Sequence, residues 1–283
     1  MEAVLQVLVG GVFTGAEYAL AAVGMTLIFG VGRVVNLAQG SFVALGAYVA
    51  YQVTLLGLPA PLGAVPAAAA GLVLGAAVDR IVVRPTRREA LTAATVLLGL
   101  AILAEQGFAL VWGTSSHSVP LRLPTFLVGR IVVGVEQMAA GAAAAVALGT
   151  VALYLRTKPG LALRAAAVDA EIAALGGVDV ERIQTATFGV ACGMAAAAGA
   201  LLAPLLTLTP AMGRVPLVLL LAMVAAGGPD RIWGTLVAGF GIGLASTIIG
   251  FYLDPAWSYV FALLVLIGAV LWRADGVLGR MRP

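Results

Sequence analysis

The sequence predicts an all-α fold, a polytopic transmembrane helix bundle of about eight or nine spans that forms one integral-membrane domain over residues 1–283. Hydrophobic residues make up 62% of the chain and charged residues only 10%, with a mean hydropathy of +1.08. A soluble domain carries about 25% charged residues instead. The apolar residues also fall into runs of roughly 20, the length that crosses a bilayer as a helix, and the basic residues cluster between these runs.

Nine apolar runs are candidates for membrane spans, and the seventh is the shortest. Basic residues cluster in three of the intervening regions, at 80–88, at 156–182 and at 273–282. Because Lys and Arg favour cytoplasmic loops, all three regions are expected in the cytoplasm. Nine alternating spans then place the N-terminus outside and the C-terminus inside, whereas eight spans result if residues 214–234 are re-entrant. The runs cover residues 7–31, 40–57, 62–83, 91–112, 133–155, 184–206, 214–227, 235–253 and 257–272.

A polar island, GRVVNLAQGS at 32–41, interrupts the apolar sequence directly after the first run. Unpaired polar groups in hydrocarbon are costly, so its side chains should be buried among helices, line a watery path or lie at a membrane face. An interfacial loop whose side chains cap helices is the simpler alternative. The polar side chains are those of Arg33, Asn36, Gln39 and Ser41.

Glycines at helical spacing predict closely packed spans. Four pairs form the G-x-x-x-G pattern inside apolar runs, where the missing side chains let helices approach. The pairs are Gly11–Gly15, Gly71–Gly75, Gly189–Gly193 and Gly239–Gly243.

The region 113–130 is expected outside the membrane. It carries the single histidine, His117, which is expected to be an exposed loop residue, and its second part, 121–129, is expected along the membrane interface.

The longest cytoplasmic connection, at about 156–183, has the pattern of a short helix. Pro159 and Gly160 end the preceding span, and glycines at 176–177 provide a helix stop. Between them, apolar residues at helical spacing predict one amphipathic helix over 161–177. Such a helix lies on a lipid surface or docks into a partner's groove, and its mixed acidic and basic polar face favours docking. The apolar residues are Leu161, Val168, Ile172 and Leu175.

Enzymatic chemistry is not expected from this chain. The only lysine, Lys158, precedes Pro159 and is not part of a phosphate-binding loop, so ATP hydrolysis would need separate subunits. One histidine and one cysteine, Cys192, exclude a multi-histidine or multi-cysteine metal site. Nothing resembles a nucleic-acid patch. The sequence therefore predicts no catalytic residue, no metal site and no cofactor.

Three segments near the first spans carry a resemblance to a known family. They are Tyr18-Ala-Leu, GMTLIFGV from Gly24 and NLAQG from Asn36, and they follow the pattern YALxALGLTLIYGVxxxxNFAHG. This pattern is typical of the permease subunits of ABC importers for branched-chain amino acids and related amides and urea. Further segments occur in family order as far as Gly276-Val-Leu-Gly, so the chain resembles this family over nearly its whole length.

The resemblance implies partners and a location. The chain would pair with a second permease, two cytoplasmic ATPase subunits and an external solute-binding protein in the bilayer of a bacterial cytoplasmic (inner) membrane. In this family the loop that corresponds to residues 164–177 contains the coupling helix that meets the ATPase. The resemblance therefore implies coupling roles for Arg164, Asp169, Glu171 and Gly176.

The sequence also departs from the family pattern. Gln39 replaces the histidine that usually follows Asn-Phe-Ala, and Glu17 and Glu105 stand at positions that the family tends to leave uncharged. These changes leave the identity of the solute open, although a branched-chain amino acid or a related compound is implied.

Two classes of transporter agree with these residues. In an ATP-driven importer, the translocation pathway is predicted along Asn36, Gln39, Ser41, Glu17 and Glu105, with Arg33 at the cytoplasmic end of the first span pair. In an ion-coupled secondary transporter, Glu17 or Glu105 would carry a proton or pair with an ion. Both carboxylates could instead lie near span ends and bind a neighbour. A channel filtered by the island is a third option, but the segment 161–177 favours the importer, because a secondary carrier has no evident need for it.

Overall fold

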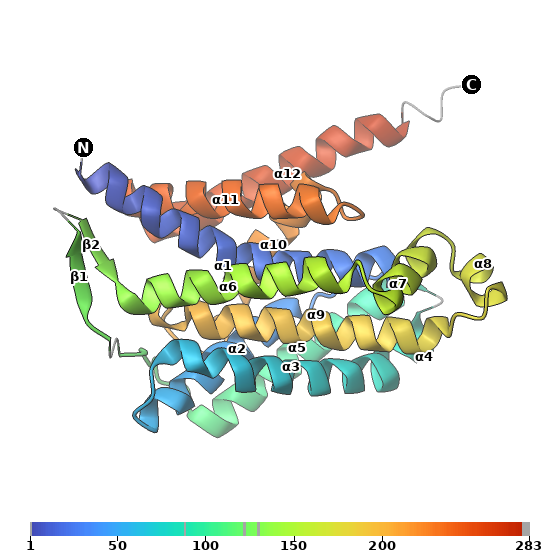
Figure 1. Cartoon of the computed structure of the whole chain (residues 1–283), viewed down its shortest axis with the longest axis horizontal. Coiled ribbons are helices and arrows are strands. Elements are labelled where there is room, and N and C mark those ends of the chain that lie inside the picture. Colours follow the sequence, from blue (N-terminus) through green and yellow to red (C-terminus); the bar gives the residue numbers. More distant parts are fainter. Residues whose placement is uncertain (1, 88, 121–122, 129–130, 279–283) are drawn as a thin grey trace.

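The computed structural model describes residues 2–87, 89–120, 123–128 and 131–278. Most helices run along one axis of an elongated bundle, with a short β-hairpin at one end and helices α7 and α8 at the other (Figure 1). We call these the hairpin end and the α7–α8 end. The helices are α1 (Glu2–Gly32), α2 (Gln39–Leu55), α3 (Ala64–Val78), α4 (Arg84–Thr86), α5 (Ala90–Trp112), α6 (Val135–Tyr154), α7 (Lys158–Val168), α8 (Ala170–Leu175), α9 (Val180–Leu202), α10 (Arg214–Gly227), α11 (Ile232–Tyr252) and α12 (Pro255–Leu278).

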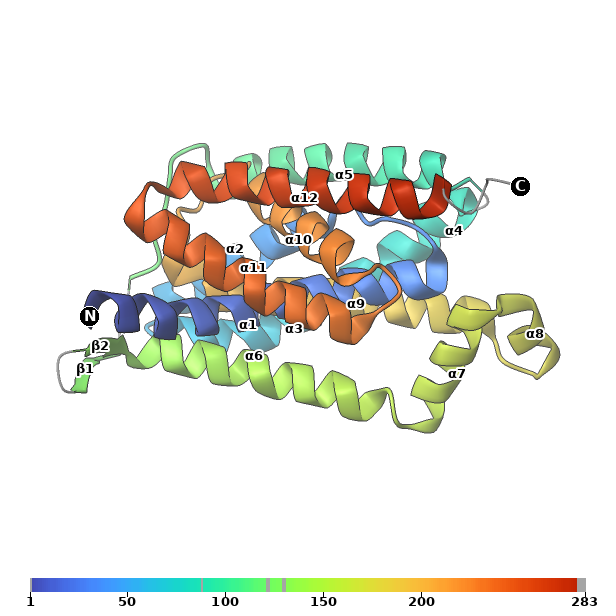
Figure 2. The same ribbon diagram turned by 90° about the horizontal axis from the view of Figure 1, so that it is seen from above.

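Helices α1 and α9 form the centre of the bundle. In the most apolar window of each, 78% of the residues are buried, compared with 17% in α5 and 22% in α6. Figure 2 shows α5 and α12 along one edge of the bundle and α6 along the opposite edge. The apolar faces of the outer helices are therefore left to contact lipid or another chain.

The four G-x-x-x-G motifs pair off as two helix crossings, which confirms the predicted close packing. A Cβ on Gly243 would lie 2.6 Å from the Cα of Gly15, so α11 meets α1 through glycines. In the same way, a Cβ on Gly189 would lie 2.8 Å from the carbonyl oxygen of Leu72, where α9 meets α3. Small residues thus let four backbones approach closely.

Helices α2 and α10 begin inside the bundle. The first residue of α2, Gln39, lies level with Ala21 of α1 and Ala191 of α9, since its side chain donates to both carbonyl oxygens. Gly213, which precedes α10, packs against Gly40. From this level α2 runs toward the hairpin end and α10 toward the α7–α8 end. Their N-termini therefore meet within the bundle.

Each of the nine predicted apolar runs coincides with a helix. Among the described residues, six helices are long and apolar enough to cross a membrane, whereas α10 and the apolar part of α12, Ala256–Trp272, are shorter. Helix α3 extends through a π-helical turn, Asp79–Val83, into α4, and short 3₁₀ turns, Ala60–Gly63 and Ala203–Leu205, lie before α3 and after α9.

The bundle is all-α, as predicted, and one short hairpin at its end adds two strands that the prediction did not include. Strands β1 (Thr125–Val128) and β2 (Ile131–Gly134) pair antiparallel, with Phe126 opposite Val133. Their sequences, TFLV and IVVG, are rich in β-branched residues, which favour strands. His117, expected to be an exposed loop residue, is half-buried, and it exchanges two backbone hydrogen bonds of 2.9 Å with Leu208. Part of the stretch predicted along the interface, 121–122 and 129, lies outside the described residues.

Candidate functional site

The polar island is folded into the centre of the bundle. Helix α1 ends at Gly32, and Arg33 adopts a left-handed conformation with φ 53° that turns the chain back inward. The Asn36 side chain then accepts from the backbone N–H of Ala38 at 3.1 Å and donates to Gln39 Oε1 at 2.8 Å. Both Asn36 and Gln39 are fully buried. The island is thus a hydrogen-bonded junction that fixes where α2 begins.

Gln39 connects three helices through this junction. Its Nε2 donates to the carbonyl oxygen of Ala21 at 3.3 Å and to that of Ala191 at 3.2 Å. Asn36 Nδ2 also lies 3.7 Å from Cys192 Sγ on α9. A buried amide that binds two helices holds the start of the third at a fixed depth, which a leucine at the same position could not do.

A cavity lies directly beside this junction, on the edge of the bundle that carries α5. Its volume is about 230 Å³, many times the ~10–15 Å³ that one water molecule needs. Of the residues predicted for the pathway, Ser41 and Glu105 line this cavity, while Asn36, Gln39 and Glu17 do not. The lining residues are Leu37, Gly40, Ser41, Leu98, Ala101, Ile102, Glu105, Gly213, Arg214 and Leu217.

Two of the lining residues form an ion pair. Arg214 Nε donates to Glu105 Oε1 at 2.8 Å and Nη2 donates to Oε2 at 2.7 Å, which is the bidentate geometry that arginine forms with carboxylates. The Glu105 side chain is 12% exposed and that of Arg214 is 70% exposed. Glu105 lies within α5 and Arg214 begins α10, so this charge pair is at the depth of the apolar runs.

Arg214 is the candidate that the sequence prediction missed. It is the first residue of the apolar run 214–227, and a charged residue at the start of a predicted span is the signal that could have identified it. Its carboxylate partner was predicted, but the pairing joins residues 109 positions apart. No local pattern reveals such a contact.

Glu17 does not line this cavity. Its side chain is 1% exposed within α1, and its Oε2 has no hydrogen-bond partner among the described residues. A buried polar group with one unbonded oxygen is costly, so Glu17 is a functional candidate.

The predicted coupling helix is in fact two short helices. Asp169 has an extended backbone, and its Oδ1 accepts from the N–H groups of Glu171 and Ile172 at 2.9 and 3.0 Å, so it ends α7 and caps α8. Asp169, Glu171, Arg164 and Gly176 are all exposed.

An apolar surface accompanies these charges. The residues expected on the apolar helix face are exposed, led by Leu175 at 89% and Val168 at 85%. The segment is anchored by Leu163, Ala166 and Ala173, which cluster against Val31 of α1. The α7–α8 segment therefore has a buried side facing the bundle and an uncovered apolar side facing away from it.

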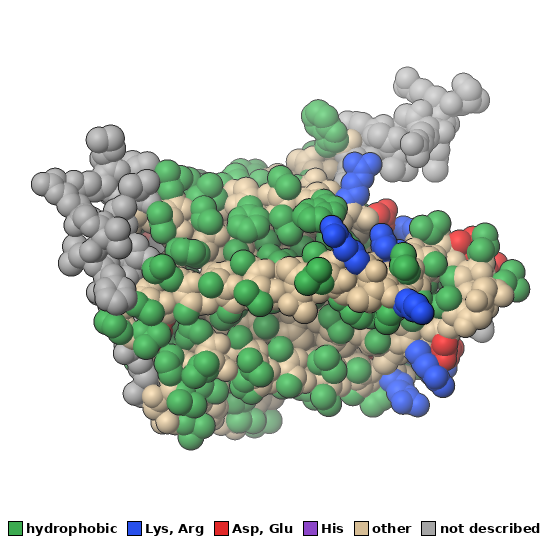
Figure 3. All heavy atoms as spheres, viewed as in Figure 1, with side chains coloured by type: hydrophobic (Ala, Val, Ile, Leu, Met, Phe, Trp, Pro, Cys, Tyr) green, Lys and Arg blue, Asp and Glu red, His purple; other side chains and the backbone are tan. Residues whose placement is uncertain are grey.

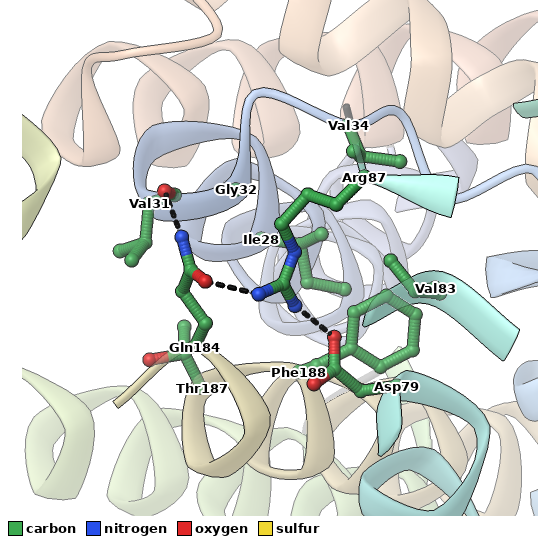
Figure 4. Close-up of a pocket in the computed structure, with 10 residues that line it drawn as sticks. All are labelled: Ile28, Val31, Gly32, Val34, Asp79, Val83, Arg87, Gln184, Thr187 and Phe188. Carbon is green, nitrogen blue, oxygen red and sulfur yellow. Dashed lines mark hydrogen bonds and ion pairs between the residues drawn. The ribbon is translucent and has the colours of Figure 1, made fainter. Parts of the chain in front are cut away.

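A buried polar network lies close to this anchor (Figure 4). Asp79, fully buried in the π-helical turn, pairs with Arg87 and accepts from Thr185 Oγ1 at 2.6 Å. Gln184 of α9 accepts from Arg87 and donates to the carbonyl oxygen of Val31 at 3.2 Å. The network joins the ends of three helices to the residue on which α7 packs. The cavity beside it is only about 10 Å³, space for one water molecule at most.

Basic side chains gather at the α7–α8 end, as the blue side chains in Figure 3 show. Arg33 also lies there and pairs with Asp230 at 3.1 Å. Among the Lys and Arg residues whose side chains are described, Arg214 alone lies away from this end. The others are Arg33, Arg80, Arg84, Arg87, Arg156, Lys158, Arg164, Arg182 and Arg231.

Comparison with known proteins agrees with this architecture. A family model described as "Branched-chain amino acid transport system / permease component" matches residues 7–270. The high-affinity branched-chain amino acid transport system permease protein LivH of Escherichia coli (strain K12) is 26% identical over 98% of this chain and 96% of its own length. The high-affinity branched-chain amino acid transport system permease protein BraD of Pseudomonas aeruginosa is 27% identical over 98% of this chain and 96% of its own length. The probable branched-chain amino acid transport permease protein LivH of Methanocaldococcus jannaschii is 28% identical over 96% of this chain and 92% of its own length. No solved structure matches the chain. The chain is thus a multi-pass membrane protein that belongs to the family of branched-chain amino acid transport system permease components.

Proposed function

We propose that the chain is the membrane-spanning permease subunit of an ATP-driven ABC importer in a bacterial inner membrane. Its solute is a branched-chain amino acid or a related small compound, delivered by an external binding protein. A second permease and two cytoplasmic ATPase subunits complete the transporter. The observation that carries this proposal is the α7–α8 segment, which is anchored on α1 and leaves apolar and charged residues uncovered at the basic end.

The distribution of charge supports the orientation. Since Lys and Arg favour the cytoplasmic side, the α7–α8 end is proposed to face the cytoplasm. Helix α1 begins at the opposite end and α12 finishes at the α7–α8 end, so the N-terminus is outside and the C-terminus inside (Figure 1). The chain then crosses nine times as a single permease domain. Two of the crossings, 33–55 and 203–227, combine an irregular stretch with a short helix.

The pathway is proposed along the cavity at the N-termini of α2 and α10. Ser41 and Glu105 contact the passage directly, and Asn36 and Gln39 act by holding α2 in place. Interrupted helices that meet inside a membrane protein commonly border a solute site, because irregular backbone is tolerated there only where protein or water covers it.

A secondary transporter is the second candidate, and Glu17 favours it. A buried carboxyl group with an unbonded oxygen is the kind of residue that carries protons in such proteins. Glu105, the other candidate, is already bound by Arg214 in a bidentate pair. The exposed α7–α8 surface has no role in that mechanism, so the importer is the better-supported function.

The docking role of α8 can be tested with Glu171→Arg combined with Leu175→Arg. Both side chains are exposed, and Asp169 stays in place to cap α8, so the bundle should still fold. We expect the ATPase subunits to lose affinity for the tagged permease by on the order of 10-fold or more, as for an interface hot spot. Co-purification and solute-stimulated ATP hydrolysis measure this effect.

Leu56→Arg is the matched control, because Leu56 is 78% exposed at the hairpin end. It should leave co-purification unchanged. Normal co-purification and ATP hydrolysis with the Glu171→Arg, Leu175→Arg variant would refute ATPase docking at α8.

A further inference from the structure

The Glu105–Arg214 pair is placed and oriented as a binding site. Two N–H groups of the guanidinium bind the carboxylate of Glu105. Arginine has five N–H donors, so others remain on a side chain that is 70% exposed and lines the 230 Å³ cavity. Carboxylate oxygens likewise accept more than one hydrogen bond each, which leaves Glu105 able to bind a second donor.

A purely structural role does not explain this position. The pair lies at the depth of the apolar runs, where a charge facing hydrocarbon is costly. An ion pair that served only to join α5 to α10 would be better placed in the interior, yet the Arg214 side chain is 70% exposed. The α5 edge must therefore face a polar passage or another chain in the assembled protein.

The cavity offers two kinds of surface. One wall carries the opposite charges of Glu105 and Arg214 together with the hydroxyl of Ser41. The other walls are aliphatic, from Leu98, Ile102, Leu217, Leu37 and Ala101. The N-termini of α2 and α10 meet beside it, where Gly40 and Gly213 line the cavity, and their partial positive charge adds to that of Arg214.

We propose that Glu105 and Arg214 together recognise a zwitterionic solute with an aliphatic body. The ammonium group of the solute binds Glu105, its carboxylate binds Arg214, and its side chain lies on the aliphatic walls. Both the ion pair and the zwitterion have zero net charge, so the cavity keeps zero net charge with the solute bound. The site would distinguish amino acids from uncharged amides or urea. This inference rests on the proposed permease function.

Direct binding to the assembled permease–ATPase complex, without the external binding protein, tests the site. Radiolabelled leucine is the probe, and leucinamide and 4-methylpentanoate are competitors that lack the carboxylate and the ammonium group, respectively. In the wild type, both competitors should be weaker than leucine by on the order of 10- to 100-fold, since each lacks a charge-assisted contact.

Each single variant should lose its discrimination against a different competitor. With Arg214→Gln the carboxylate no longer contributes, so leucinamide should compete as well as leucine does. With Glu105→Gln the ammonium group no longer contributes, so 4-methylpentanoate should compete as well as leucine does. The swap Glu105→Arg, Arg214→Glu keeps an ion pair for folding, and it should still bind leucine, with its orientation reversed. Arg80→Gln with Glu89→Gln removes one base and one acid at exposed positions and should keep the wild-type ratios.

Two results would overturn the proposal. In the first, both single variants still prefer leucine over leucinamide and 4-methylpentanoate as strongly as the wild type does. The other is an equal loss of all three ligands in folded complexes, which would show that the pair only shapes the cavity. Neither result would affect the permease function, because ATP-driven uptake by the wild-type complex is measured separately.

Discussion

At the scale of single residues, buried polar side chains decide where the helices begin. Asn36 donates to Gln39, and Gln39 donates to backbone carbonyl groups of α1 and α9, so the chain can turn back into the bundle with both amides hydrogen-bonded. These contacts span up to 152 positions in the sequence. The residues themselves were identified from their polarity in an apolar context. Their partners were not, because only the fold brings Ala21 and Ala191 to Gln39.

Replacing Gln39 tests this junction. Gln39→Leu removes three side-chain hydrogen bonds from a fully buried site and leaves the amide of Asn36 poorly satisfied, which should cost about 1–3 kcal/mol of stability. Thermal unfolding in detergent measures the loss, and solute uptake should change because α2 borders the cavity.

Gln39→His is the matched control, since histidine both donates and accepts and is the residue that the family usually carries there. It should unfold near the wild-type temperature. Wild-type stability and uptake kinetics with Gln39→Leu would contradict the role of the junction.

At the scale of elements, the sequence predicted the position of every long helix but not the depth of the short ones. The length of an apolar run is a local property of the sequence, so the nine runs could be identified from the sequence alone. The start of α2 inside the bundle depends on its crossing with α10, which involves Gly40 and Gly213 from distant segments. The break between α7 and α8 was missed for a local reason: Asp169 caps the second helix, although the apolar spacing continues through it.

The glycine crossing gives a sharp prediction. A Cβ on Gly40 would lie 2.9 Å from the Cβ of Leu217 and closer still to the carbonyl oxygen of Gly213, so α2 and α10 would have to separate. Gly40→Ala should therefore destabilise the bundle by about 1–3 kcal/mol, as overpacking does, and lower the melting temperature in detergent.

Gly99→Ala in α5 is the matched control. Nothing lies within 4 Å of the added Cβ, so the change should be neutral or stabilise by up to about 1 kcal/mol, as in an exposed helix. Equal melting temperatures for the two variants would rule out a tight crossing at Gly40.

At the scale of the whole molecule, the features proposed for function lie in two places, at the α7–α8 end and along the α5 edge. The α7–α8 end carries the basic residues and the uncovered α8 surface, whereas the cavity and its ion pair open on the α5 edge. Helices α1 and α9 form the centre, and α1 packs on α11 as α9 packs on α3. Force applied at α8 is proposed to reach the cavity through α1, on which α7 is anchored by Val31. The energy source is therefore expected at the α7–α8 end and the solute at the α5 edge.

Uptake by proteoliposomes tests this account most directly. The chain is reconstituted with a second permease, the ATPase subunits and the external binding protein, and accumulation of radiolabelled leucine is followed. The account predicts that accumulation needs ATP on the ATPase side and is unaffected when a protonophore removes the proton gradient. Accumulation by this chain alone, driven by a proton gradient without ATP, would contradict it and identify a secondary transporter that uses Glu17.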